Sequence, residues 1–165
     1  MSTEIAEIRE FVTKVEAFMV NDLQAALSEN ANFLPALGLL VYTEILGGLV
    51  TGNLITGPKV DNFKAFLKYL GNPYLELDAK FDIYGKVRSG LVHQYLLNQE
   101  GTIRRGIEPH DICGVLIRND SWIEIAVDKY FDDFKRAIAK YKCDLLDKQL
   151  PELIKAIQKI PMGKI

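Results

Sequence analysis

"NFLPALGLLVYTEILGGLV", residues 32–50, is apolar nearly throughout and sets the architecture of the whole chain. Asn32 is a favourable N-cap and Pro35 is tolerated in the first helical turn, so the stretch is predicted to be a helix. A helix that is apolar all round is typical of a buried, central element. Its length is close to that of a membrane span, but Glu44, the paired glycines and the missing basic flank favour a core helix. No membrane partner is therefore expected.

Helical periodicity extends to both sides of this segment. Residues 3–28 place apolar side chains three or four positions apart with charged side chains between them, which predicts a long amphipathic helix. Pro58 precedes a short helix expected over 59–70, which "GNP" ends. A fourth helix is expected over 78–97, because its apolar and aromatic residues form one stripe.

The pattern changes after "NQEG". "TIRRGIE", residues 102–108, is short and extended, and "DICGVLIRNDSWIEIAV", residues 111–127, has two β-branched runs around a plausible hairpin turn. Asp128 is expected to cap a fifth helix and Pro151 to begin a last one. The predicted fold is mainly α (α+β). It is a single domain, 1–165, of about five to six helices, with a small antiparallel hairpin inserted near 111–127 before the C-terminal helices.

Composition limits the possible functions. The chain has 165 residues, is 48% hydrophobic and 25% charged, and carries a net charge of -2, as expected for one globular domain. This charge argues against purely electrostatic binding of long duplex nucleic acid. Cys113 and Cys143 have no zinc-site spacing, so no structural metal is expected. Two thiols without a disulfide framework, and an N-terminus unlike a signal peptide, favour a cytoplasmic location.

One polar cluster interrupts the predicted fourth helix. "KVRSGLVHQY", residues 86–95, carries Arg88, His93 and Tyr95. On a straight helix Arg88 and His93 lie about 140° apart, whereas Arg88 and Tyr95 lie within about 20°. Gly90 permits local distortion or close approach of another backbone. For the pair alone, a purely structural role, with a snorkelling arginine and a hydrogen-bonded histidine, is the favoured explanation.

"RSGLVHQY" matches the pattern Arg-x4-His-x-Tyr and resembles the signature of HEPN domains (higher eukaryote and prokaryote nucleotide-binding). The resemblance implies a helical bundle that dimerises at the motif and cleaves RNA without metal or cofactor, with Arg88 and His93 as catalytic residues. Some bacterial members are toxins paired with a minimal nucleotidyltransferase antitoxin, and Tyr95 matches the tyrosine that such an antitoxin modifies. Ser89 departs from the Asn, Asp or His that often follows the arginine in active members.

The chemistry agrees with this resemblance. RNA is cleaved without metal when its own 2′-OH attacks the adjacent phosphate, which yields a 2′,3′-cyclic phosphate. His93 supplies a group that transfers protons near neutral pH. Arg88 supplies a fixed cation for the charged transition state.

Four further residues are candidates or controls. Glu44 on the apolar helix is either a rim or ion-paired residue, or an orienting partner for the motif. Arg104 and Arg105 either hold RNA phosphates or form a solvated pair. His110 is expected to be an exposed turn residue.

Three functions follow from these observations. The first is a homodimeric HEPN-type endoribonuclease, a toxin or defence component that acts on RNA. The second is a catalytically silent HEPN-like module that binds a nucleotide or a partner. The third is an unrelated helical-bundle interaction protein, in which Arg88 and His93 are structural.

Overall fold

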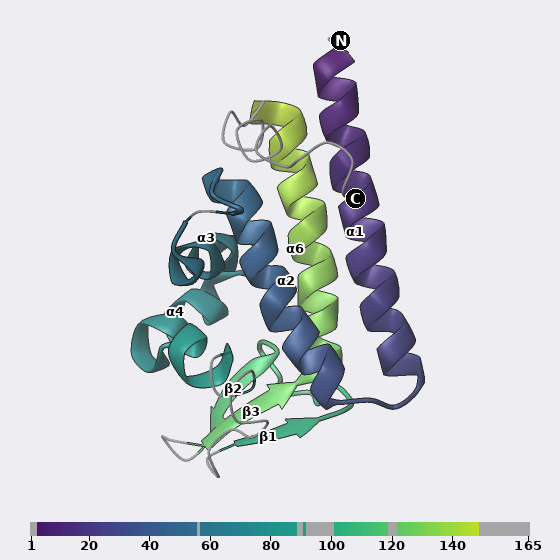
Figure 1. The fold of residues 1–165 in the computed structure, drawn as a ribbon. Helices are drawn as coiled ribbons and strands as arrows, with labels where there is room; N and C mark the ends of the chain where they lie inside the picture. The colour runs from purple at the N-terminus through teal and green to yellow at the C-terminus, as the bar shows by residue number, and fades with distance from the viewer. Residues whose placement is uncertain (1–2, 56, 89–90, 92–100, 119–121, 149–165) are drawn as a thin grey trace.

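A bundle of helices stands on a small β-sheet (Figure 1). The computed structural model describes residues 3–55, 57–88, 91, 101–118 and 122–148. The elements are α1 (Thr3–Ser28), α2 (Phe33–Thr51), α3 (Lys59–Leu70), α4 (Asn72–Phe81), a π-helical turn (Tyr84–Arg88), β1 (Gly101–Arg104), β2 (Val115–Arg118), β3 (Trp122–Ala126) and α6 (Val127–Lys148). The predicted fold class is confirmed, since the chain is mainly helical with a small sheet before its C-terminal helix. The helix expected after Pro151 lies outside the described residues.

Helix α2 is the central element, as its sequence predicts. It packs against α1, α3 and α6, and ten of its residues are buried. The side-chain oxygen of Asn32 accepts a hydrogen bond from the Phe33 amide at 2.7 Å, which confirms the expected cap. Within the described part of the chain, α2 alone is long and apolar enough to cross a membrane, and 56% of its most apolar window is buried inside the protein. The core helix of a globular protein passes the same test.

The backbones of α2 and α3 touch. A Cβ atom added at Gly47 would lie only 1.6 Å from the carbonyl oxygen of Asn62. The side chain of Asn62 also stabilises the C-terminal end of α2. It accepts a hydrogen bond from the Thr51 hydroxyl at 2.7 Å and donates one to the Asn53 carbonyl at 3.1 Å. Glycine at position 47 is thus what allows α3 to lie this close.

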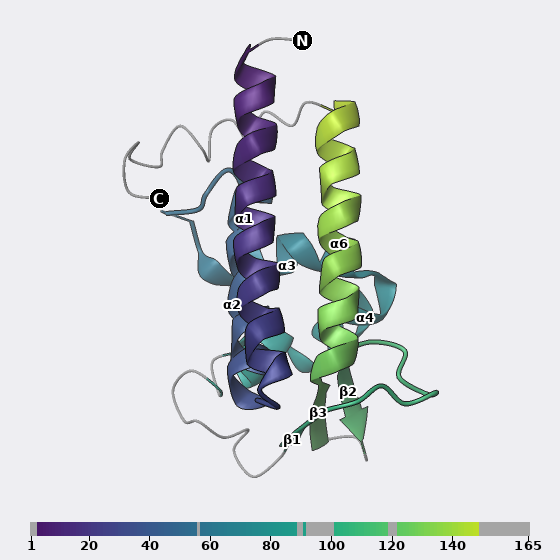
Figure 2. The ribbon, with the colours of Figure 1, turned by 90° about the vertical axis from the view of Figure 1, so that its right-hand side faces the viewer.

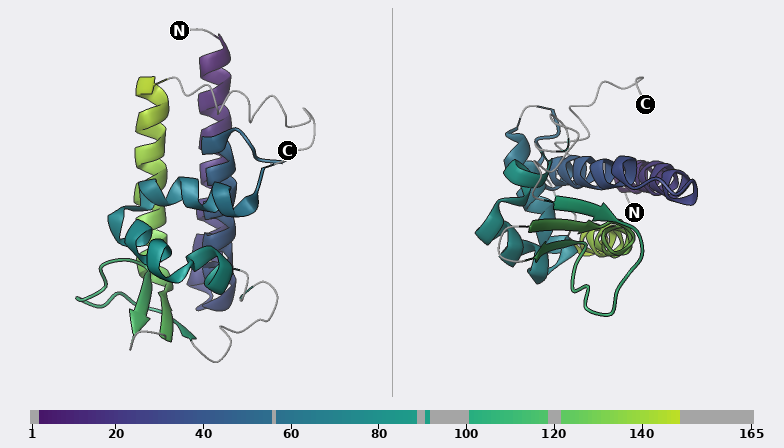
Figure 3. Two further views of the ribbon diagram at one scale, coloured as in Figure 1. Left: turned by 90° about the vertical axis from the view of Figure 1, so that its left-hand side faces the viewer. Right: turned by 90° about the horizontal axis from the view of Figure 1, so that it is seen from below.

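The helices α1 and α6 lie side by side and run antiparallel (Figure 2). They are joined by the ion pair between Glu16 and Lys142. Their apolar faces meet α2 in one continuous core. The sheet lies against the start of α6, as the view from below in Figure 3 shows, because β3 leads directly into this helix.

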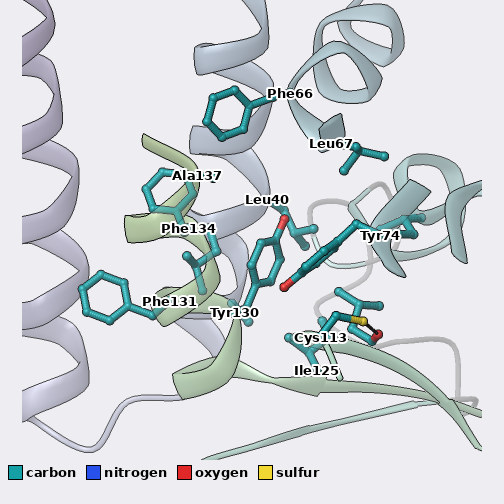
Figure 4. Close-up of a cluster of buried hydrophobic side chains, with 14 of the residues drawn as sticks. Leu40, Phe66, Leu67, Tyr74, Cys113, Ile125, Tyr130, Phe131, Phe134 and Ala137 are labelled. Atoms are coloured by element: carbon teal, nitrogen blue, oxygen red, sulfur yellow. Dashed lines mark hydrogen bonds between the residues drawn. The ribbon is translucent and has the colours of Figure 1, made fainter. Parts of the chain in front are cut away.

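Two tyrosines form the polar centre of an otherwise apolar core. The rings of Tyr74 and Tyr130 are fully buried and their centroids are 5.4 Å apart. Figure 4 shows them beside Leu40, with Cys113 and Ile125 on the side of the sheet. Burial of the rings therefore links α4 and α6 to the sheet.

Both buried hydroxyls have partners. Tyr130 Oη lies 3.0 Å from the hydroxyl of Thr43 on α2. Tyr74 donates to Asp133 at 2.8 Å and accepts the Gly114 amide at 2.8 Å. Burial, followed by the negative charge of Asp133, raises the pKa of Tyr74 well above 10, which keeps this hydroxyl protonated. Hydrogen bonds of this kind offset the cost of placing polar groups in a core.

The sheet has the strand order β1-β3-β2. Strands β2 and β3 pair antiparallel, so the hairpin predicted near 111–127 is confirmed. Of the extended segment expected at 102–108, only residues 102–104 belong to a strand, since β1 pairs in parallel with β3 from Gly101 opposite Ile123 to Arg104 opposite Ala126. Local sequence patterns do not indicate which distant strand a short segment joins.

The fourth helix differs from its prediction over 78–97. Helix α4 begins earlier, at Asn72, with Pro73 in its first turn. It ends at Phe81, because Asp82 adopts a left-handed conformation with φ 50°. The Asp78 carboxylate accepts the amide of Ile83 at 3.0 Å and stabilises this break. The chain resumes as the π-helical turn Tyr84–Arg88, so Arg88 follows a kink rather than a continuous α-helix.

Candidate functional site at Arg88

The first residue of the motif is joined to the central helix by an ion pair. Arg88, at the end of the π-helical turn, places Nη2 2.9 Å from Oε2 of Glu44 on α2. Both side chains are mostly covered, with exposed fractions of 19% for Arg88 and 9% for Glu44. The two residues are 44 positions apart in the chain. The structure therefore brings together two of the residues that the sequence singled out.

Tyr84 completes the cluster. Its hydroxyl lies 3.4 Å from the same Glu44 oxygen, and the Arg88 guanidinium lies 5.5 Å from the centre of its ring. A cation at this distance from a tyrosine ring is attracted by the ring's negative face. Tyr84 was expected only as part of an apolar stripe. Nothing local in the sequence indicates that it faces Glu44.

The charges around Tyr84 act in opposite directions. Burial, followed by the negative charge of Glu44, raises the pKa of the Tyr84 hydroxyl, and the positive charge of Arg88 opposes this rise. The hydroxyl is therefore protonated at neutral pH and donates to Glu44. It limits how the carboxylate can turn and so helps to fix the guanidinium.

One donor of Arg88 stands out. Its Nε atom is buried and has no hydrogen-bond partner among the described residues. A buried donor without a partner costs about 1–3 kcal/mol, so native structures rarely keep one without a reason. The donor sits at a π-helical turn, a feature that occurs frequently at functional sites.

The other motif residues lie outside the described part of the chain. These are Ser89, His93 and Tyr95. Their distances from Arg88 stay predictions. The separation of about 140° between Arg88 and His93 assumed a straight α-helix, and the π-helical turn ending at Arg88 removes that assumption.

Arg104 and Arg105 are engaged inside the protein. Arg104 donates to Asp111, to Glu124 at 2.8 Å and to the Gly106 carbonyl at 2.9 Å. These bonds hold β1 against β3 and the loop that follows β1. They favour a structural role for Arg104 over phosphate binding.

Arg105 joins three separate segments. It pairs with both oxygens of Asp128 on α6 at 2.9 and 3.0 Å. It also donates to the carbonyls of Leu27 and Ala31 at 3.0 and 3.1 Å, where α1 ends. Asp128 lies in the first turn of α6 rather than before it, and its carboxylate also accepts the Gly106 amide. Asp128 is thus not the expected cap, but links α6 to the chain that follows β1.

One group of residues has the composition of a metal site. Ligand atoms of Glu108, His110 and Asp111 lie within 4.8 Å of one another. However, Asp111 is bound by Arg104, and His110 Nε2 lies 2.8 Å from the guanidinium of Arg118. Arginines of the protein already bind Asp111 and His110, so the cluster is a network of ion pairs and hydrogen bonds. His110 is exposed, as expected.

The cluster at Arg88 fixes one cation against one carboxylate and one phenol. Such an arrangement orients a guanidinium for binding an anion. It also stabilises the packing of the π-helical turn against α2. Comparison with known proteins finds no matching family model, no matching curated protein and no matching solved structure.

Proposed function

We propose that the protein is a metal-independent endoribonuclease of the HEPN type, centred on Arg88 and His93. Arg88 stabilises the charge that develops on the phosphate. His93 takes the proton of the attacking 2′-OH and passes it to the 5′-oxygen, which leaves as the P–O5′ bond breaks. The products are a 2′,3′-cyclic phosphate and a 5′-hydroxyl. Glu44 and Tyr84 act as positioning residues, because they contact Arg88 rather than the RNA.

The ion pair between Arg88 and Glu44 carries the proposal. Catalysis by a fixed cation requires a guanidinium whose orientation is set before the substrate arrives. Oε2 of Glu44, on the central helix, lies 2.9 Å from Nη2 of Arg88, while Nε of Arg88 has no partner among the described residues. An arginine placed only for solubility would extend into water.

The proposal includes a two-fold dimer with the motif at its interface. Two copies meeting there would bring a second Arg88 and His93 into one cleft. A nucleotidyltransferase antitoxin that modifies Tyr95 is the partner that the resemblance implies. The cytoplasm is the proposed location, since it contains RNA and keeps Cys113 and Cys143 reduced.

The decisive experiment is cleavage of single-stranded RNA pools by the full chain in the presence of a chelator. His93→Ala should lower the rate about 10²–10⁴-fold through loss of acid–base catalysis. Arg88→Lys should lower it about 10²–10³-fold, since the charge is kept but the planar fork of donors is lost. Product ends should carry the cyclic phosphate.

Two controls make the result specific. His110→Ala removes the other histidine and should leave the rate unchanged. Thermal unfolding of each variant shows that lost activity is not lost structure. A wild-type chain that cleaves none of a diverse set of RNAs would overturn the proposal and favour the silent binding module.

A structural role is the second candidate, and the burial of the ion pair favours it. Here Arg88 and Glu44 only fasten the π-helical turn to α2 in an interaction protein. Arg88→Met alone should then cost about 2–3 kcal/mol, somewhat below the value for a fully buried pair because Arg88 is partly exposed. The double variant Arg88→Met with Glu44→Leu should recover most of this loss. A double variant that recovers stability, together with a wild-type chain that does not cleave RNA, would identify this role.

A further inference from the structure

An apolar groove runs between α1 and α2. It has a volume of about 700 Å³ and is lined by residues of the middle of α1, between Glu10 and Met19, of the C-terminal half of α2 and of the chain just after α2. Its lining is mostly apolar, with Glu10 and Lys14 at the edge. Phe18 and Ile55 in this groove are 65% and 54% exposed. Large apolar side chains gathered in one groove indicate a surface that something covers.

The end of the chain has the composition to cover it. In residues 152–160 the apolar side chains fall on one side of a helix and the charged ones on the other. The apolar stripe spans about 160° at about 100° per residue. The residues of this stripe are Leu153, Ile154, Ala156, Ile157 and Ile160. These residues lie beyond the described part of the chain.

The end of α6 lies level with the groove. Lys142 of α6 pairs with Glu16 of α1, and α6 ends at Lys148, about 9 Å further along its axis. Because α1 and α6 run antiparallel (Figure 2), this end lies level with the N-terminal half of α1, near Glu10. Residues 149–151 span about 10 Å when extended, which is about one helix diameter.

Length and charge also fit. A helix over 152–160 is about 13 Å long, the same as the rise from residue 10 to residue 19 of α1 along the groove. Residues 149–165 carry three lysines against Glu152 alone. Residues 3–20 of α1 carry four glutamates against Arg9 and Lys14. The two segments therefore attract each other.

We infer that residues 152–160 form an amphipathic helix that docks into the groove between α1 and α2 of the same chain. Leu153, Ile157 and Ile160 cover Phe18 and Ile55. This contact stands independently of any ribonuclease activity.

Hydrogen exchange of the full chain, read out on fragments covering residues 152–160, tests this contact. A nine-residue helix is marginal by itself, so slow exchange requires docking. We expect exchange at least tenfold slower than in a free peptide of residues 149–165. Phe18→Asp or Ile55→Asp should return it to the rate of the peptide. Both side chains are more than half exposed, so neither change threatens the fold.

Matched variants and dilution complete the test. Leu34→Asp, at a 64% exposed position on α2 outside the groove, should leave the protection unchanged. Ile157→Asp should abolish the protection and the neighbouring Gln158→Asp should keep it. Exchange at the peptide rate in the wild type, or protection that survives both groove variants, overturns the inference. Protection that disappears on dilution assigns the groove to a second copy and overturns it as well.

Discussion

Arg105 shows how one side chain can hold distant segments together. Its guanidinium bonds to Asp128 at the start of α6 and to the carbonyls of Leu27 and Ala31 at the end of α1. Removing it would leave a partly buried carboxylate and two carbonyls without this donor. Burial alone raises the pKa of Asp128, but the hydrogen bond from Arg105 and the Gly106 amide hold it below its usual value.

Arg105→Ala should therefore lower the free energy of unfolding by about 1–3 kcal/mol. Urea denaturation measures this loss. Arg9→Ala, at an exposed position on α1, is the matched control and should change stability by less than about 0.5 kcal/mol. If Arg105 instead binds RNA phosphates, its removal would reduce the salt dependence of RNA affinity and leave stability intact.

A second prediction concerns the contribution of the Tyr74 hydroxyl to stability. Tyr74→Phe removes the donor to Asp133 and the acceptor of the Gly114 amide, both buried. We expect a loss of about 1–3 kcal/mol in calorimetric or urea unfolding, because the amide is left unpaired in the core. Tyr69→Phe is the control, since that hydroxyl donates to Asp144 at 3.2 Å at a half-covered site. An equal loss in both variants would contradict the special role of Tyr74.

At the scale of elements, the contact between α2 and α3 depends on a missing side chain. Gly47→Ala would place a Cβ atom 1.6 Å from the backbone oxygen of Asn62, which cannot move without shifting α3. We expect a loss of at least about 3 kcal/mol in the free energy of unfolding. Gly38→Ala on the same helix meets only the end of the Leu23 side chain at 3.0 Å, and alanine gains helix propensity there. Similar stabilities for the two variants would refute this interpretation of the contact.

The regular elements were predictable because their signals are local. The bounds of α1 and α3 follow from apolar spacing together with the stop at "SENAN" and with Pro58 and Gly71. The break at Asp82 was not predictable. It depends on the left-handed conformation of Asp82 and on the hydrogen bond that the Asp78 carboxylate accepts from the Ile83 amide. The apolar stripe in the sequence continues across this break. Periodicity shows which side is buried, but not whether the helix continues.

Of the candidate site, the contact between Arg88 and Glu44 could be anticipated from the sequence, and its geometry only partly. Glu44 was notable because a carboxylate on an apolar helix requires a partner. An ion pair and an orienting contact to the motif were among the alternatives for Glu44, and the contact to Arg88 at 2.9 Å is found. Tyr84 was missed, because its approach to Glu44 depends on the π-helical turn. Such a turn leaves no pattern in the sequence.

At the scale of the whole molecule, ionic contacts hold the strands and their loops together and join the chain after β1 to α6. Burial, the largest effect, raises the pKa of Asp111, but the hydrogen bond and charge of Arg104 and the Glu108 amide bring it below its ordinary value of 3.8. For Glu124, burial is likewise outweighed by hydrogen bonds from Arg118 and Arg104, so its pKa falls below 4.5. Asp128 behaves in the same way through Arg105.

These depressed pKa values predict that the molecule is sensitive to acid. Since the folded values lie below the unfolded ones, the stabilisation is fully present above the unfolded pKa, at about pH 5 and higher, and is lost as the pH falls through the folded values. The free energy of unfolding in urea should be level from pH 7 to 5.5 and decline below about pH 4.5. Arg104→Met should lose about 3 kcal/mol at pH 7, because Asp111 is left buried and unpaired. The decline in acid should then become shallower, since the pKa values of Asp111 and Glu124 return upward. Arg9→Met should keep the steep decline, and an Arg104→Met variant with an unchanged slope would show that these carboxylates do not control acid stability.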